Sequence, residues 1–249
     1  MKQRNYKKTT SRIVSFIQDT FFNEKGYKKA IIGISGGIDS AVIAQLLVLA
    51  LGRKNVIGYH LPCYFQADTK DVITMFEFLM LPYNKIDIKK MMDGYANGNV
   101  WGDASQIRIA NIKARCRMIV LYDQSYEHNA LVVGTGNRTE LELGYFTLYG
   151  DGACALEPMG HLYKTEVFEL ARYLKIPEAI INKAPSAGLW DGQTDEGELG
   201  YTYKQIDEML YDLEVNDGKI STITNLYLDV FERIDKNKFK SELPKMIKE

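Results

Sequence analysis

The chain has 249 residues, of which 46% are hydrophobic and 25% charged, and 31 Lys and Arg residues nearly balance 32 Asp and Glu residues. These proportions are those of a globular protein and exclude a disordered, collagen-like or repeat-array chain. The balanced charge predicts neither a nucleic acid nor an anionic membrane as a partner. The length fits one large domain or two small ones.

Targeting signals and cysteine pairs are not visible in the sequence. The longest strongly apolar stretch, 41–51, is far shorter than the ~20 residues that span a membrane. The basic N-terminus leads into an amphipathic pattern instead of a signal peptide. Cys63, Cys116 and Cys154 form no CxxC pair, which disfavours a disulfide framework or a thiolate zinc site. We therefore expect a cytoplasmic protein.

Strand and helix patterns alternate along the first half of the chain. Helices are predicted over 6–22, 40–51, 67–79 and 104–122, and strands over 30–34, 56–61, 84–88 and 130–134. This alternation predicts an α/β fold, a doubly wound parallel sheet with helices on both faces.

The second half of the chain has a different residue pattern. Residues 139–160 are rich in Gly and aromatic side chains, and 184–200 reads as a long polar loop. Helices are predicted over 164–174, 203–213 and 220–234. Because no Pro- or Ser-rich linker separates the halves, we expect a single domain over 1–249.

The most specific motif is SGGIDS at residues 35–40, between a buried strand and an apolar helix. Its glycines permit a tight turn, and the N–H groups of the following helix can bind an anion. Asp39 beside a phosphate site is best explained as a Mg²⁺ ligand. A chance match is on the order of a few in ten thousand, so a phosphate loop is favoured over a plain connection with a capping serine.

Two common nucleotide loops are excluded. The sequence has no Gly-Lys-Ser/Thr for a kinase-type loop. Gly134-Thr135-Gly136 does not complete a dinucleotide fingerprint, because Thr139 stands where the third glycine should be.

SGGIDS instead resembles the pyrophosphate-binding loop of the ATP pyrophosphatases, which cleave ATP to AMP and pyrophosphate to form an adenylate. GMP, asparagine, tRNA-lysidine and NAD synthetases share this loop. Further blocks, in order and spacing, resemble the NAD synthetase family: NIKARCRM (111–118), GTGNRTE (134–140), GYFTLYGD (144–151), LYK (162–164), KAPSA (183–187) and DEGELG (195–200).

The resemblance implies a doubly wound α/β fold, usually in a homodimer with deamido-NAD bound near the subunit interface. It implies a ligase that uses ATP to adenylate the nicotinate carboxylate of deamido-NAD and ammonia to form NAD, the last step of NAD biosynthesis. The 184–200 loop would then serve as a lid that keeps water from the adenylate.

The resemblance to the family assigns site residues by their positions in the matched blocks. Mg²⁺ would be held by Asp39 and Glu140, deamido-NAD would contact Arg115 and Lys240, and Asp151 would bind ammonium or accept its proton. The ATP contacts would be Gly33, Ile34, Ser35, Gly36, Gly37, Ile38, Asp39, Ser40, Thr135, Lys164 and Ser186.

Several of these residues have a purely structural alternative. Glu140 and Glu142 could both be surface charges, and at most one is expected to be a ligand because they face different ways. Arg115 and Arg117 could be exposed on their helix. Asp195 and Glu196 are most simply a solvated pair, and we do not assign them to the site.

The chain departs from the family pattern at three positions. Leu148 replaces a common lysine, Ala155 replaces a common aspartate, and Phe239 stands before Lys240 where a histidine is common. The first two usually touch deamido-NAD. Part of that subsite is therefore expected to be built differently.

Roughly 30 residues precede the loop and roughly 45 follow the last matched block, too few for a glutaminase domain. An N-terminal cysteine nucleophile is also missing, so we expect the ammonia-dependent form. Two alternatives stay open: another ATP-pyrophosphatase synthetase or amidotransferase subunit, and an ATP-binding regulator without turnover.

Overall fold

The structure is a computed structural model that describes residues 4–24, 26–64, 69–98, 105–186, 192–216, 224–244 and 246–247. A π-helical turn, Asp19–Glu24, continues the first helix. The elements in chain order are α1 (Tyr6–Gln18), β1 (Lys29–Gly33), α2 (Ile38–Leu51), β2 (Val56–His60), α3 (Thr69–Leu79), β3 (Asn84–Lys85), α4 (Lys89–Asn97), α5 (Gln106–Glu127), β4 (Ala130–Val132), α6 (Arg138–Leu143), α7 (Lys164–Tyr173), α8 (Glu178–Ile181), α9 (Asp195–Leu199), α10 (Tyr203–Val215) and α11 (Asn225–Asn237).

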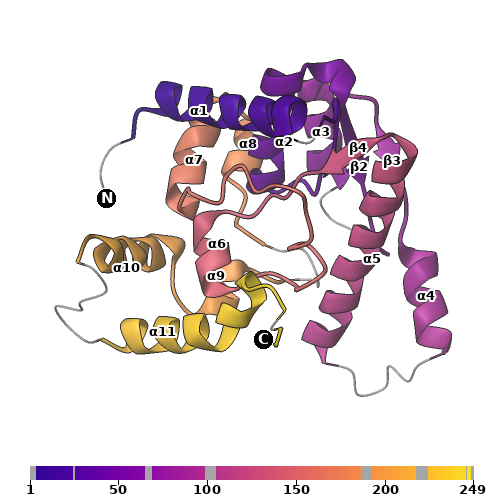
Figure 1. The fold of residues 1–249 in the computed structure, drawn as a ribbon. Coiled ribbons are helices and arrows are strands. Elements are labelled where there is room, and N and C mark those ends of the chain that lie inside the picture. Colours follow the sequence, from indigo (N-terminus) through magenta and orange to yellow (C-terminus); the bar gives the residue numbers. More distant parts are fainter. Residues whose placement is uncertain are drawn as a thin grey trace.

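The strands form a parallel sheet in the order β3-β2-β1-β4, and helices surround this sheet (Figure 1). Ile31 of β1 pairs with Ile57 on one side and Val132 on the other, and a further parallel bridge joins Val133 to Leu156. The chain runs outward from β1 to β3 and then returns to the opposite side of β1. The crevice between β1 and β4 is therefore the switch point at which such sheets bind ligands.

Helices cover both faces of the sheet, which confirms the predicted doubly wound α/β fold. Successive β1 side chains point to opposite faces: Ile32 packs in the cluster that holds α2, whereas Ile31 packs in the cluster that holds α5. In the described ranges, no helix is both long and apolar enough to cross a membrane.

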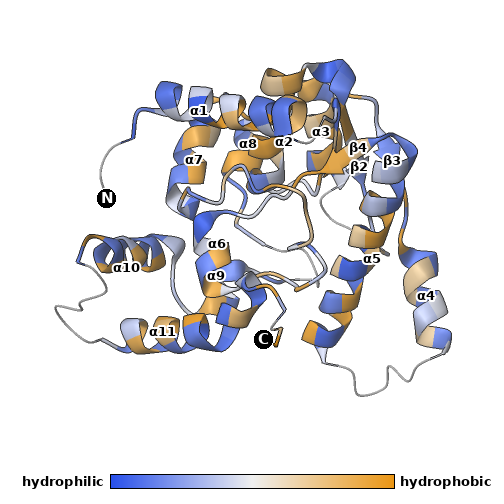
Figure 2. Cartoon of the chain, in the orientation of Figure 1, coloured by the Kyte–Doolittle hydropathy of each residue, from blue (hydrophilic) through white to orange (hydrophobic). Residues whose placement is uncertain are grey.

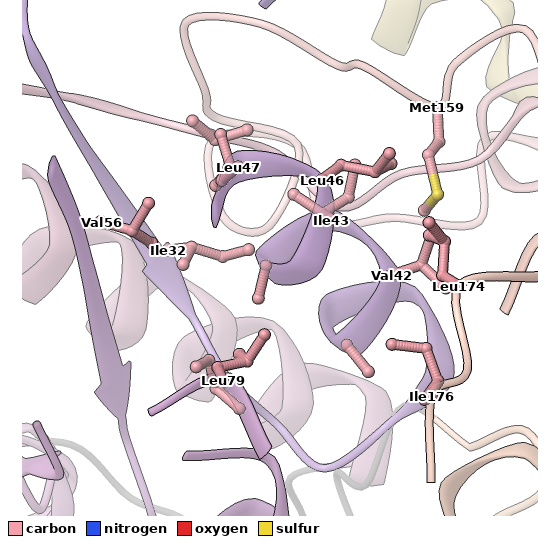
Figure 3. Packing of buried hydrophobic residues seen from close by; sticks show 14 of the residues in the cluster. Ile32, Val42, Ile43, Leu46, Leu47, Val56, Leu79, Met159, Leu174 and Ile176 are labelled. Atoms are coloured by element: carbon pink, nitrogen blue, oxygen red, sulfur yellow. The ribbon is translucent and has the colours of Figure 1, made fainter. Parts of the chain in front are cut away.

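Helix α2 is the centre of the larger core cluster. Between Ala41 and Leu47 only Gln45 is not fully buried, and neighbours reach this helix from several other elements (Figure 3). Val56 lies on β2, Leu79 on α3, and Met159 in the loop before α7. A helix that is apolar on all sides must be enclosed in this way, and each buried aliphatic side chain contributes about 1.5–3 kcal/mol. The first turn of α2 is thereby fixed against the sheet.

Most predicted elements are present, with shifted boundaries. The predicted helix over 220–234 is α11, and its first residues lie in 217–223, outside the described residues. Helices α4, α8 and α9 were not predicted, and α9 lies within 184–200, which was expected to be a loop. Because α4 buries only Met92 and α8 has a single turn, neither shows an apolar stripe in the sequence.

The C-terminal helices form a separate layer with α6, in which Leu143, Tyr163, Ile206 and Val230 share a smaller cluster. Figure 2 shows α10 and α11 alternating between hydrophobic and hydrophilic residues, as expected of helices with one buried face. Helix α11 packs against the end of α6 at Gly144. This glycine has a φ of +61°, and its lack of a side chain leaves room for Asn237. An added Cβ would lie 2.3 Å from the Asn237 Cβ.

We expect Gly144→Ala to lower the free energy of unfolding by about 2 kcal/mol more than Gly200→Ala, measured by urea unfolding. Both glycines end a helix with positive φ, but an added Cβ at Gly200 meets no atom within 4 Å. The two substitutions therefore share the backbone strain and differ in the clash with Asn237. Equal losses would contradict the proposed close packing of α11 on α6.

Candidate active site

A cavity of about 780 Å³ opens at the carboxyl edge of the sheet, at the switch point between β1 and β4. Loops after these strands, the first turn of α2, and parts of α5 and α11 form its wall. It gathers most of the predicted site residues in one place: Gly33, Ile34, Ser35, Gly37, Ile38, Asp39, Ser40, Thr135, Glu140, Asp151, Lys164, Ser186 and Lys240. Gly36 and Arg115 do not line it.

The SGGIDS turn is held by its own serines. The hydroxyls of Ser35 and Ser40 share a hydrogen bond of 3.1 Å, the Gly37 N–H donates to Ser35 Oγ, and Ser40 Oγ donates to the Gly37 carbonyl. Gly36 makes the turn with a φ of +82°. Since no side chain caps α2 at Gly37, the first N–H groups of this helix remain available to an anion in the cavity.

Lys164 joins two of the predicted metal ligands. Its Nζ lies 2.6 Å from an Asp39 carboxylate oxygen and 3.0 Å from one of Glu140. The lysine side chain is only 2% exposed, whereas each carboxylate is 17% exposed. The ammonium group therefore lies beneath the carboxylates, and both carboxylates keep an open side.

The charges in this cluster change one another's proton affinity. Burial raises the pKa of Glu140 to about 8, and the charge of Asp39 adds to this rise, although Lys164 opposes it. Burial alone would lower the pKa of Lys164, but Asp39 and Glu140 outweigh it and raise that pKa. Lys164 also lies 5.0 Å from the centre of the Tyr203 ring. The lysine thus carries its charge in a nearly solvent-free place.

Helix α6 presents Glu140 to the cavity through a capping box. The Asn137 side chain accepts from the Glu140 N–H, and the Glu140 carboxylate accepts from the Asn137 N–H. Asn137 also donates to Asp39 at 2.9 Å, so it connects α6 to the phosphate loop. Glu142 instead faces outward and pairs with Arg138. The expectation that the two glutamates face different ways is confirmed.

The interpretation of Asp195 as a solvated charge is wrong. Its side chain is 4% exposed and accepts hydrogen bonds from Tyr145 and Tyr203. Burial raises the pKa of Tyr203, and the neighbouring carboxylates add to this rise, so both tyrosines act as donors. Asp195 begins α9, and residues 187–191 of the predicted 184–200 loop lie outside the described residues.

Asp151 lies on the loop between α6 and α7. Its carboxylate accepts from the Thr147 N–H at 2.9 Å, and the Thr147 hydroxyl donates to Asn111 of α5. Desolvation raises the pKa of Asp151, while hydrogen bonds from Thr147 and the charge of Arg117 oppose the rise. Asp151 nevertheless remains accessible to solvent from the cavity.

Lys240, near the C-terminus, also lines the cavity and interacts electrostatically with Asp151. Its Nζ donates to the carbonyls of Gly144 and Phe146, at 2.7 and 3.0 Å. None of Leu148, Ala155 and Phe239, the three departures from the family pattern, lines the cavity. Ala155 and Phe239 are exposed, so these positions lie outside the pocket that the described residues form.

Arg115 and Arg117 of α5 occupy different places. Arg115 donates to the Leu148 carbonyl at 3.2 Å and does not line the cavity. Arg117 lines the cavity and donates to the Leu61 carbonyl after β2. The site thus contains a guanidinium that the sequence interpretation did not assign.

Asn137, Arg117 and Glu157 are the principal site residues that sequence reasoning missed. Only Asn137 had a usable signal, since an N-x-x-E pattern at a helix start is typical of a capping box. Glu157 lines the cavity at the end of a segment with no recognisable strand pattern.

Comparisons with known proteins identify the family of the chain. A family model described as NAD synthase matches residues 9–244. The chain is 40% identical to an NH(3)-dependent NAD(+) synthetase of Fusobacterium nucleatum, over 98% of this chain and 96% of that protein. It is 41% identical to the protein of the same name in Thermococcus sibiricus, over 98% of each.

Two solved structures share the fold and most of the length. An NMN synthetase from Francisella tularensis matches with a TM-score of 0.88 and 33% identity, over 98% of this chain and 99% of that one. An NH3-dependent NAD synthetase from Campylobacter jejuni, in complex with the nitrate ion, matches with a TM-score of 0.84 and 34% identity, over 99% and 100%. The chain belongs to the NAD synthase family.

Proposed function

We propose that this protein is an NAD synthetase that uses ATP to adenylate the nicotinate carboxylate of deamido-NAD and ammonia to convert the adenylate into NAD and AMP. The observation that carries this proposal is the convergence of the SGGIDS turn, the Asp39–Lys164–Glu140 cluster and Asp151 on one cavity. Family membership and the names of the full-length relatives support the substrate and the nitrogen donor.

ATP would bind with its phosphates at the first turn of α2. The N–H groups of that turn and the hydroxyls of Ser35 and Ser40 offer donors to phosphate oxygens. Thr135 and Ser186 also line the cavity and would contact ATP. Lys164 offsets the negative charge that accumulates when the nicotinate carboxylate attacks the α-phosphate.

We also propose that Asp39 and Glu140 hold Mg²⁺. Both carboxylates reach the same lysine nitrogen, so their oxygens converge, and both keep an exposed edge toward the cavity. Within the described ranges, no cluster of three or more Asp, Glu, His or Cys side chains is suited to a metal. Mg²⁺ typically binds one or two carboxylates and completes its shell with phosphates and water, and when bound it would neutralise charge on the pyrophosphate leaving group.

The second half-reaction takes place beside Asp151. A carboxylate here can bind ammonium close to the adenylate carbonyl. Lys240 and Arg117 bring positive charge to the same part of the cavity and would contact the remainder of the nicotinate nucleotide, with Arg115 supporting this loop from outside.

A second candidate substrate is nicotinate mononucleotide, because the Francisella protein with a TM-score of 0.88 is named NMN synthetase. The departures at Leu148 and Ala155 alter positions that usually touch deamido-NAD, which also favours testing a shorter substrate. The two candidates share the nicotinate carboxylate and differ only in the adenylate half of the dinucleotide.

We further propose a cytoplasmic homodimer. The three cysteines are free thiols, as expected in a reducing compartment. Ile119, Tyr122 and Tyr126 recur on one face of α5 and are 51%, 40% and 93% exposed. An apolar stripe of this kind is suited to a protein–protein interface.

The first test is product analysis with ATP, Mg²⁺ and either deamido-NAD or nicotinate mononucleotide, each with ammonium or glutamine. We expect NAD, AMP and pyrophosphate in equal amounts from deamido-NAD and ammonium. A higher kcat/KM for nicotinate mononucleotide would favour the second candidate. ATP binding without any amide product would support a regulator or another adenylating activity.

Asp39→Asn should reduce Mg²⁺-dependent turnover by about a hundredfold or more, because it removes a charged metal ligand. The asparagine can still hydrogen-bond to Asn137, and Lys164 keeps Glu140, so the thermal unfolding transition should remain cooperative. Asp93→Asn, at an exposed carboxylate paired with Lys89 on α4, is the matched control. Near-normal turnover of Asp39→Asn would refute the metal assignment.

If the α5 stripe forms the dimer interface, Ile119→Glu should convert the protein from dimer to monomer, measured by light scattering during size-exclusion chromatography. Burying a charge at an apolar interface is costly. Leu228→Glu, at a 57% exposed residue of α11, is the control. An unchanged mass for Ile119→Glu would place the interface elsewhere.

A further inference from the structure

Glu157 lies at the carboxyl edge of the sheet with no role assigned so far. It follows Leu156, whose carbonyl accepts from the Gly134 N–H, beside the bridge that adds this segment to β4. Side chains that follow directly after parallel strands meet at the ligand-binding edge. Glu157 lines the cavity together with Asp151 and the Gly134–Gly136 loop.

The loop after β4 is shaped to admit this carboxylate. An added Cβ at Gly134 would lie 2.4 Å from the Glu157 carboxyl carbon, and one at Gly136 would lie 3.2 Å from its oxygen. The Gly136 N–H donates to one carboxylate oxygen at 2.9 Å, and the Cys154 thiol donates to the other at 3.2 Å. No Lys, Arg or His of the described ranges forms an ion pair with Glu157.

Asp151 has different surroundings. Its carboxylate accepts from Thr147, and the positive charges of Arg117 and Lys240 lie close enough to interact with it. Nearby positive charge favours the ionised form of a carboxyl group. Of the two carboxylates in this part of the cavity, Glu157 is therefore the one that lacks a compensating cation and the better proton acceptor.

We propose that Glu157 accepts the proton that ammonium must lose before it can attack the adenylate, while Asp151 holds the ammonium ion in place. This proposal rests on the proposed function. One N–H bond of ammonium breaks and its proton passes to the Glu157 carboxylate. The nitrogen lone pair then forms the C–N bond, AMP leaves as the C–O bond breaks, and a second proton departs from nitrogen with the AMP phosphate or to water.

The electrostatics around Glu157 support this role. Burial raises the pKa of Glu157 to about 7 and the charge of Asp151 adds to the rise, while hydrogen bonds from Cys154 and Gly136 oppose it. Burial also raises the pKa of the Cys154 thiol and that of Tyr122 on α5, and the charge of Cys154 adds to the rise at Tyr122. Both neighbours stay protonated near neutral pH. A general base is most effective with a pKa near the working pH.

The test compares two nucleophiles in Glu157→Gln, which retains an acceptor for the Gly136 N–H. Ammonium chloride supplies a cation that must be deprotonated, whereas hydroxylamine is already neutral near neutral pH and gives a hydroxamate from the same adenylate. We expect kcat/KM for ammonium to fall by about a hundredfold, and hydroxamate formation to change by no more than a few-fold. The ammonium defect should shrink at alkaline pH, where free ammonia is abundant.

Controls separate the possible failures. Glu169→Gln, at an exposed residue of α7 paired with Arg172, should match the wild type with both nucleophiles. Asp151→Asn should raise the KM for ammonium more than it lowers kcat, because it weakens binding of the cation and leaves the proton acceptor in place. Equal losses with ammonium and hydroxylamine in Glu157→Gln would overturn the role of Glu157. A wild-type protein that releases no pyrophosphate with either nicotinate nucleotide would overturn the proposed function instead.

Discussion

The buried ammonium group of Lys164 is the interaction on which the rest of the site depends. Removing such a charge from water costs several kcal/mol unless carboxylates and hydrogen bonds compensate it. Here the compensation comes from Asp39 on α2 and Glu140 on α6, while Lys164 itself begins α7. Three helices from distant parts of the chain must therefore meet at one point. The separation between the phosphate loop and α6 is fixed as a result.

The charge balance of this cluster also determines what the cavity attracts. When Glu140 is ionised, as a nearby bound cation would favour, the two carboxylates outweigh the one ammonium, with the lysine underneath and the carboxylate edges exposed. Such an arrangement favours a further cation and resists an unaccompanied triphosphate. The groups of the cavity that can bind negative charge are the first N–H groups of α2 and the side chains of Arg117 and Lys240. If Asp39 and Glu140 hold Mg²⁺ as proposed, phosphates and metal bind together.

The parts of the site that lie on consecutive residues were predicted best from the sequence. A strand, a glycine turn and an apolar helix occupy consecutive residues, so the place of Ser35–Ser40 follows from the pattern itself. For Arg115 and Arg117, the sequence pattern did not predict which side chain faces the cavity. Both lie on α5, which packs on β1 and β4 along one side and on α4 along another, so no single apolar stripe tells which arginine faces the cavity. Only the tertiary packing assigns that face to Arg117.

The prediction that Asp195 is a solvated charge was wrong for a related reason. Its partners are Tyr145, from the loop after α6, and Tyr203, at the start of α10. A carboxylate in a polar segment looks solvated until such distant donors are known, because burial of a charge depends on hydrogen bonds that sequence spacing does not reveal. The same limitation applies to Glu157, which enters the cavity only because Gly134 and Gly136 leave space for it.

These observations divide the cavity into two ends with different origins. The end proposed to bind ATP is built from the N–H groups of the SGGIDS turn, which one motif specifies, and from the Lys164 cluster, which draws on three helices. The end proposed to bind the nicotinate nucleotide is built from the loop before Asp151, which Lys240 and Asn237 tie to the C-terminal segment. A substitution in α11 can therefore reshape the nicotinate end without touching the phosphate loop. Leu148 and Phe239 adjoin residues of this second end and do not line the cavity, so their departures from the expected pattern leave the phosphate loop unchanged.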